Sequence, residues 1–317
     1  MKKVTIMIPT YNQPQYIEQC INSAMAQDYP NLEIVISDDS TNDETEKIIL
    51  EKYTHDSRIH YFHNETRLGR VGNYHHTLYE KATSDYAINL DGDDWFIDNT
   101  YITNAATLLD QNPDVICVIA RIQFFYEDEQ RMEYGTGYEK LDSIDEGGKY
   151  LYLVTNHKVP FNHMTVLYRR EEAMKIGFYT KDTTWADSES IFRLVCNSKM
   201  AFIDEHVGVW RIHDRNESSS FHKSIDIEDI FSNDDSIERF CSKCEKGAYG
   251  VSTWIDESRY HNAKGLVKYL IQTKQYAKLL EFFKFFAKQY PQLFFSSLPR
   301  LVIYLIKTKI LFFYKSL

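Results

Sequence analysis

Short apolar runs alternate with amphipathic segments through the first 90 residues. Buried strands are predicted by four runs of β-branched, aromatic and aliphatic side chains, at residues 4–8, 32–36, 59–62 and 86–90. Helices are predicted by apolar positions at helical spacing, at residues 14–26, 43–53 and 73–81. This alternation favours right-handed crossovers and a mostly parallel central sheet with helices on both faces. The expected fold is therefore α/β and Rossmann-like.

Polar or acidic residues follow three of these predicted strands, at residues 10–12, 38–39 and 91–94. The carboxyl ends of parallel strands meet at one edge of a sheet, where ligands bind in open α/β folds. Carboxylates as close as Asp91, Asp93 and Asp94 repel each other unless a cation neutralises them, and a hard divalent cation is the usual partner. The alternative is a solvated acidic turn.

Beyond residue 94 the pattern is less regular. Helices are predicted at residues 99–109, 171–177 and 190–197, and strands at 115–120, 122–126, 164–168, 201–203 and 207–212. Residues 127–148 are predicted to be a long polar loop. From about residue 225 the pattern becomes helical. After Glu281 the chain has no acidic residue, and Pro291 and Pro299 are expected to divide this basic, aromatic segment.

Composition narrows the function. The chain has 317 residues, is 43% hydrophobic and carries a formal net charge of −10, which excludes a general nucleic-acid binder. Its five cysteines are scattered and odd in number, so no disulfide framework is expected, and Cys241 and Cys244 have no partner pair for zinc. Neither a secretory signal nor an apolar stretch of about 18 residues is visible, so a cytosolic location or the cytosolic face of a membrane is expected.

Three motifs in order carry a resemblance to a known family: Pro9-Thr10-Tyr11-Asn12, the residues 38–41, and Asp91-Gly92-Asp93-Asp94. Over about residues 3–215 the chain resembles the family 2 glycosyltransferases of the GT-A fold. The resemblance implies a catalytic domain at residues 1–222, with a donor half (1–98) and an acceptor half (99–222). Outside the resemblance, the helical pattern and the basic, aromatic composition of residues 223–317 predict a helical region that contacts a membrane surface, packs on the protein or forms a homodimer interface.

The resemblance also implies an activity. It is metal-dependent, inverting transfer of a sugar from a nucleotide-sugar, most often a UDP-sugar, to a hydroxyl of a glycan or lipid-linked oligosaccharide in surface-polysaccharide synthesis. In this family, Pro9 and Tyr11 would flank the uracil and Asp39 would accept its N3–H. The residues implied in donor binding are Pro9, Thr10, Tyr11, Asn12, Asp39, Arg67, Asp91 and Gly92. Asp93 and His213 would hold Mn²⁺ or Mg²⁺.

The second half would supply the base and the acceptor contacts. Asp187 takes the base position, because Arg193 follows at the family's usual offset, but Ala186 replaces the usual Glu and leaves Glu189 as an alternative. Residues implied near the acceptor, or in supporting positions, are Trp95, Trp185, Glu189 and Arg211. Asp187 and Glu189 could instead be helix N-terminal acids favoured by the helix dipole. His163 and the histidines at 60, 63, 75 and 76 are expected to be surface or packing residues.

Two other functions remain open from the sequence. A non-catalytic scaffold that binds sugar nucleotides or glycans would keep the same fold. A nucleotidyltransferase would need a Gly-rich, basic loop after the first strand, and residues 9–13 have neither feature.

Overall fold

Four parallel strands form the first half of the central sheet, as the alternating pattern predicts. The computed structural model describes residues 1–183, 185–216, 227–241 and 251–315. In order across the sheet, these strands are β3 (Ile59–His63), β2 (Leu32–Asp38), β1 (Val4–Thr10) and β4 (Tyr86–Asn89). They are connected by α1 (Ile17–Met25), α2 (Glu44–Lys52), and α3 (Gly69–His76) with the π-helical turn η1 (Thr77–Lys81). Every residue of β1 and β2 is buried, which explains their continuous apolar runs.

The second half of the sheet mixes strand directions. Strand β9 (Leu167–Arg169) runs antiparallel between β4 and β6 (Val115–Tyr126), and β10 (Lys199–Ile212) pairs parallel with β6. Three short antiparallel strands extend this half: β5 (Trp95–Phe96), β7 (Arg131–Tyr134) and β8 (Ile144–Glu146). The chain thus has the expected α/β fold, with an antiparallel insertion that the pattern did not reveal.

Three sequence predictions on the second half are corrected. The two strand pairs predicted near residues 120 and 205 are each one continuous strand, β6 and β10. Strand β10 stays paired across its polar residues because register shifts on both sides of His206 accommodate them. The predicted loop at residues 127–148 contains β7, β8 and the 3₁₀ turn η2 (Tyr138–Lys140). Helix α5 (Gly147–Thr155) was not predicted, because its glycines, aromatic and β-branched residues are poor helix formers.

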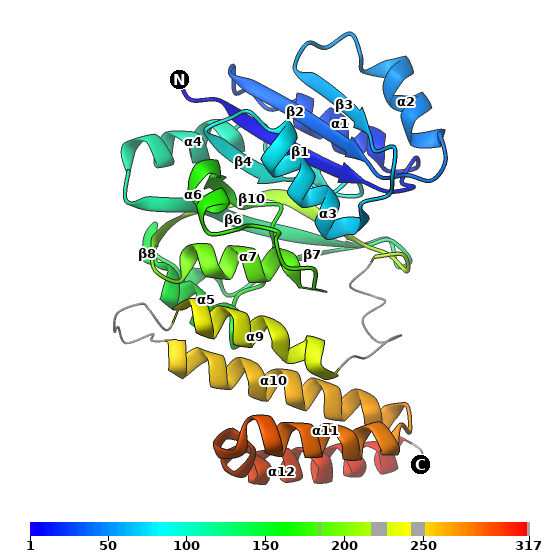
Figure 1. The fold of residues 1–317 in the computed structure, drawn as a ribbon, viewed down its shortest axis with the longest axis vertical. Helices are drawn as coiled ribbons and strands as arrows, with labels where there is room; N and C mark the ends of the chain where they lie inside the picture. Colours follow the sequence, from blue (N-terminus) through cyan, green and yellow to red (C-terminus); the bar gives the residue numbers. More distant parts are fainter. Residues whose placement is uncertain (184, 217–226, 242–250, 316–317) are drawn as a thin grey trace.

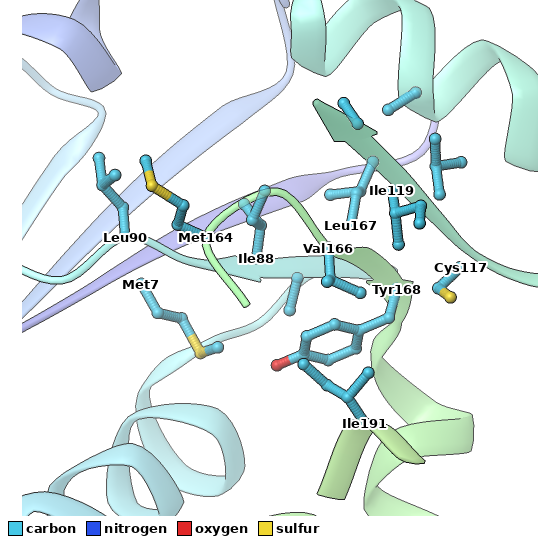
Figure 2. Close-up of a cluster of buried hydrophobic side chains, with 14 of the residues drawn as sticks. Met7, Ile88, Leu90, Cys117, Ile119, Met164, Val166, Leu167, Tyr168 and Ile191 are labelled. Atoms are coloured by element: carbon cyan, nitrogen blue, oxygen red, sulfur yellow. The ribbon is translucent and has the colours of Figure 1, made fainter. Parts of the chain in front are cut away.

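Helices of the second half of the chain pack on the sheet. Helix α4 (Tyr101–Gln111) packs on β6, and α6 (Arg170–Lys175) follows β9. Helix α7 (Ala186–Val195) begins four residues earlier than predicted, so Asp187 lies in its first turn. Figure 2 shows a part of the core to which Met7 of β1, Ile88 of β4, Ile119 of β6, Leu167 of β9 and Ile191 of α7 contribute.

The C-terminal helices form successive layers beyond the sheet (Figure 1). They are α9 (Ile227–Cys241), α10 (Val251–Gln272), α11 (Tyr276–Gln289) and α12 (Pro291–Lys315). Trp254 and Ile255 of α10 join the main core, while Phe231, Phe282 and Phe286 belong to a second core among α9, α10 and α11. Helix α12 begins at Pro291 but continues through Pro299, so the predicted break there is wrong. Among the described residues no helix is long and apolar enough to span a membrane.

Candidate active site

A cavity of about 600 Å³ opens where the carboxyl ends of β1, β2 and β4 meet the segments before β9 and α7. Its volume is within the range of ligand-binding pockets, and its place matches the usual binding edge of an open α/β sheet. Nine of the residues predicted from the sequence line it: Pro9, Thr10, Tyr11, Asp39, Arg67, Asp91, Asp93, Trp185 and Asp187. The cavity therefore joins residues of both predicted halves of the catalytic domain.

Tyr11 and Arg67 form a pair at one wall of the cavity. The Arg67 guanidinium carbon lies 4.3 Å from the centre of the Tyr11 ring, which is 39% exposed. Asp39 orders the segment that carries Arg67, because its carboxylate accepts the backbone N–H of Leu68 at 2.7 Å and that of Gly69 at 2.9 Å. The buried Asp39 thus has a structural role in addition to facing the cavity.

Asn12 and Gly92, both predicted to bind donor, are not among the residues that line the cavity. Asn12 adopts a left-handed backbone conformation, and its side-chain oxygen accepts the Thr41 N–H at 3.1 Å, which ties the loop after β1 to the loop after β2. A Cβ atom at Gly92 would lie 2.7 Å from Gln13 Oε1 and 2.9 Å from Thr10 Oγ1. These two residues shape the site by letting its loops approach each other.

The three carboxylates of the acidic loop, residues 91–94, have different hydrogen-bond partners. Asp91 Oδ1 accepts the Tyr74 hydroxyl at 2.9 Å, and Asp94 Oδ1 accepts the Arg211 N–H at 2.9 Å. Burial, followed by the charges of Asp93 and Asp91, raises the pKa of Asp94 well above its usual range. The structure thus retains the like-charge repulsion that the sequence suggested, and a cation would relieve it.

Asp93 and His213 form a candidate metal-binding pair. Their closest atoms, Asp93 Oδ2 and His213 Nε2, lie 3.0 Å apart, and both residues are buried. His213 Nδ1 accepts the Arg215 N–H at 3.1 Å, so Nε2 carries the ring hydrogen and donates it to Asp93. A metal on Nε2 would displace this hydrogen and the hydrogen bond.

The donor set fits a cation held jointly with a ligand. Within the described residues, no group of three or more His, Cys, Asp or Glu side chains is arranged to hold a metal by itself. Mg²⁺ commonly takes one or two carboxylates and completes its shell with water and substrate phosphates. One carboxylate beside one imidazole meets that requirement, although of the two residues Asp93 lines the cavity and His213 does not.

Arg211 lies behind the acidic loop rather than in the cavity lining. Its Nε donates to the Asp93 carbonyl at 2.9 Å, and its guanidinium carbon lies 4.6 Å from the Tyr16 ring centre and 4.7 Å from that of Trp95. Trp95 therefore stacks on Arg211 as part of the supporting wall. The structure places both residues in a brace for the loop that carries Asp93.

His163 is the principal site residue that sequence reasoning missed. It was expected at the surface or in packing, but its side chain is 9% exposed and lies between two carboxylates of the cavity. Nδ1 is 3.0 Å from Asp187 Oδ2, and Nε2 is 3.2 Å from Asp91 Oδ2. Although burial alone favours the neutral ring, these carboxylates raise the pKa of His163 to about 10.

The pKa of Asp187 is lowered, whereas that of His163 is raised. Burial opposes its ionisation, but the hydrogen bond and charge of His163, together with Arg70, lower the pKa of Asp187 to about 2. Its side chain is 21% exposed and lines the cavity. An ionised carboxylate is therefore held where the first turn of α7 faces the cavity.

Glu189, the alternative base, is buried and held by other side chains. Its carboxylate accepts Arg193 Nε at 2.8 Å and Arg193 Nη2 at 2.9 Å, and it also accepts the Ser236 hydroxyl at 2.6 Å. The residue is 1% exposed and is not among those that line the cavity. Glu189 and Arg193 are one helical turn apart on the same face of α7. Arg193, which follows Asp187 in the sequence motif, therefore forms its ion pair with Glu189.

The family is decided by comparison with known proteins. The family model described as glycosyl transferase family 2 matches residues 5–177, which is more than half of the chain. The chain belongs to glycosyl transferase family 2. It is 35% identical over 95 residues to the GalNAc(5)-diNAcBac-PP-undecaprenol beta-1,3-glucosyltransferase of Campylobacter jejuni, a match that covers 30% of each chain.

A second curated relative is the poly(ribitol-phosphate) beta-N-acetylglucosaminyltransferase TarS of Staphylococcus aureus. It is 30% identical over 121 residues, which cover 38% of this chain and 21% of TarS. The chain thus spans less than a third of the length of either relative.

Two solved structures support the fold. The crystal structure of S. aureus TarS 1–349 with UDP-GlcNAc matches with a TM-score of 0.61 at 18% identity, and the match covers 84% of this chain and 71% of that one. The mannosyltransferase PcManGT of Pyrobaculum calidifontis, in complex with GDP-Man and Mn²⁺, matches with a TM-score of 0.57 at 18% identity over 98% and 86% of the chains. The expected GT-A fold is confirmed.

In this family 2 member, the segment before α7 that lines the cavity is held by the C-terminal region. Asn233 of α9 donates to the Trp185 carbonyl at 3.1 Å and accepts the Thr183 hydroxyl at 2.9 Å. Trp185 is 37% exposed and lines the cavity two residues before Asp187. Other lining residues without a local sequence signal are Asn73, Tyr74, Phe161, Asn162, Trp210, Arg215 and Asn216.

Proposed function

We propose that the chain transfers a sugar from a nucleotide-sugar, with a UDP-sugar as the donor, to a hydroxyl of a glycan or lipid-linked oligosaccharide. The family membership supports glycosyl transfer, and the relatives TarS and the C. jejuni enzyme are named for transfer of N-acetylglucosamine and glucose. UDP and UDP-GlcNAc are bound in structures of TarS. Surface-polysaccharide synthesis is the proposed setting.

The donor half holds the nucleotide in this proposal. The exposed ring of Tyr11, with Pro9 and Thr10, lies beside the base, and Asp39 faces its N3–H. Asp91 lies near the ribose. Arg67 offers a cation for the diphosphate, because a guanidinium recognises phosphate oxygens in a planar, bidentate manner.

The metal proposal rests on Asp93 and His213. Together they offer one carboxylate oxygen and one imidazole nitrogen beside the acidic loop. A bound Mn²⁺ or Mg²⁺ would neutralise negative charge on the departing diphosphate as a Lewis acid. Arg211 keeps the loop in place through the Asp93 carbonyl.

Asp187 is proposed as the base, and one observation carries this assignment. It is the predicted catalytic carboxylate that faces the cavity shared with the donor-half residues, whereas Glu189 is bound by Arg193. A carboxylate in this position accepts the proton of the acceptor hydroxyl as the oxygen attacks the anomeric carbon. A single displacement with one base inverts the configuration at that carbon.

The C-terminal helices are proposed to rest on the cytosolic face of an anionic membrane. Large apolar side chains of α11 and α12 are exposed, among them Leu280 and Phe295, and the sequence after Glu281 carries only basic charges. Apolar side chains among lysines and arginines are typical of helices that lie in the membrane interface. A homodimer through the same face is the competing outcome.

A donor panel tests the proposed activity. Release of UDP or GDP is measured with Mn²⁺ and each of UDP-GlcNAc, UDP-GalNAc, UDP-Glc, UDP-Gal and GDP-Man, with water or an added glycan as acceptor. We expect one UDP-sugar to react fastest and EDTA to abolish the reaction. UDP binding without nucleotide release from any donor would instead support a non-catalytic scaffold.

A further inference from the structure

His163 connects the two halves of the cavity through both of its ring nitrogens. Its neighbours on either side of the ring are Asp187 Oδ2 at 3.0 Å and Asp91 Oδ2 at 3.2 Å. A carboxylate accepts hydrogen bonds and donates none when ionised, so both ring nitrogens carry hydrogen. The ring is therefore an imidazolium that bridges the acidic loop and the first turn of α7.

The backbone around His163 fixes this bridge from the acceptor half. The Met164 N–H donates to Asn162 Oδ1 at 2.7 Å, and the Val166 N–H donates to the His163 carbonyl at 3.0 Å, which together form a tight turn before β9. The edge of the ring meets Tyr74 at a centroid distance of 5.9 Å, and Tyr74 itself donates to Asp91 Oδ1 at 2.9 Å. The ring is thus held by a rigid turn on one side and an aromatic residue on another.

We propose that His163 is a positioning residue for glycosyl transfer, which holds the Asp187 carboxylate ionised and aimed into the cavity by bridging it to Asp91. This inference rests on the proposed role of Asp187 as the base. His163 acts through Asp187, because its Nδ1 is hydrogen-bonded to Asp187 Oδ2 and not to Asp187 Oδ1. A hydrogen bond from a buried partner restricts the carboxylate to fewer orientations. A catalytic group that is misplaced by about 1 Å can lower the reaction rate by about 100-fold.

The electrostatics of the site agree with this role. The positive ring counteracts burial and keeps the pKa of Asp187 low, so the base is ionised throughout the neutral range. Without the ring charge, burial would raise the pKa of Asp187, and more of the carboxylate would be protonated as the pH falls. Other titratable or charged groups that face this pair are Arg70 and Tyr74 of α3, Asp94 of the acidic loop and Tyr179 before α7.

The test is a double-mutant cycle with His163→Gln, Asp187→Asn and the double variant. Glutamine keeps an amide donor but has no positive charge. The rate of UDP release from UDP-GlcNAc, or from the panel donor that reacts fastest, is measured with Mn²⁺ between pH 5 and 9. His206→Gln is the matched control, because His206 is a partly buried histidine outside the cavity lining. Thermal unfolding and UDP binding show whether each variant is folded.

We expect His163→Gln to lower kcat by roughly 10- to 100-fold and to move the acid limb of the kcat–pH profile to higher pH. UDP should still bind, and the double variant should be no slower than Asp187→Asn. The proposal would be overturned if His163→Gln had the same kcat as His206→Gln. It would also be overturned if the loss of kcat in the double variant were the product of the losses in the two single variants. If His163→Gln does not fold, His163→Asn is judged by the same two criteria. An Asp187→Asn variant with full activity would instead contradict the assigned base.

Discussion

Asp234 gives the chain a pH-dependent stability that can be worked out from its surroundings. It lies in α9 at 5% exposure, where Oδ1 accepts the Ser258 hydroxyl at 2.8 Å and Oδ2 accepts the Asn262 amide at 3.0 Å. Burial outweighs these hydrogen bonds and raises the pKa of Asp234 to about 7 from its usual 3.8. The folded state therefore keeps this proton where the unfolded state has lost it.

The sign and size of the effect follow from this difference in proton binding. Below about pH 4 Asp234 is protonated in both the folded and the unfolded state, and its contribution to the free energy of unfolding is fully present. This contribution is lost as the pH rises to about 7, because the folded state then still binds a proton that the unfolded state has released. One pKa unit corresponds to about 1.4 kcal/mol, so the loss over the whole window is roughly 4 kcal/mol. Asp234→Asn replaces the carboxyl with a neutral amide that does not titrate, and it removes this loss.

The assay is urea-induced unfolding of wild type and Asp234→Asn at pH 5 and pH 8. The free energy of unfolding of the variant, relative to wild type, should rise by about 3 kcal/mol between these two pH values. Asp128→Asn is the control, because Asp128 is an exposed aspartate in the turn after β6 and its substitution should change neither curve. A difference in the free energy of unfolding between Asp234→Asn and wild type that does not vary with pH would mean that Asp234 has the same pKa in the folded and unfolded states.

Three further predictions address the donor site, the metal and the membrane. Gly92→Ala places a methyl group against Gln13 and Thr10, and we expect weaker UDP binding in calorimetry and a loss of about 1–3 kcal/mol of stability; wild-type affinity would contradict it. Asp93→Asn should raise the Mn²⁺ concentration needed for half-maximal nucleotide release, and an unchanged Mn²⁺ titration would remove Asp93 from the metal site. The chain should float with vesicles that contain phosphatidylglycerol but not with neutral ones, and Phe295→Asp should weaken this binding; a dimer in light scattering without flotation would favour the interface between copies.

The donor side could be predicted because its signals are local in the sequence. Each loop follows an apolar strand directly, and parallel strands bring their carboxyl ends to one edge, so Tyr11, Asp39 and Asp91 were expected to meet. The strand pairing of β1 with β2 and β4 is sufficient to place them. Side-chain direction was not predictable, so the contacts by which Asn12 and Gly92 bring the loops of the site together could not be read from the sequence.

The acceptor side could not be predicted to the same depth, because its contacts join distant segments. His163 lies 72 residues from Asp91 and 24 from Asp187, and its neighbouring residues carry no pattern that marks a site. Its position depends on β9, which inserts antiparallel between β4 and β6. Glu189 was a candidate because the sequence does not show that Arg193, one turn later, turns toward it.

The Asp187→Asn variant tests whether Asp187 is the base of the transfer reaction. The amide keeps the size of the side chain but cannot accept the proton of the attacking hydroxyl. Sugar transfer from the preferred donor should fall by about 100- to 10,000-fold, while UDP affinity remains that of wild type. Asp182→Asn, an exposed aspartate in the same segment, should keep full activity. Transfer at the wild-type rate by Asp187→Asn would show that Asp187 is not the base.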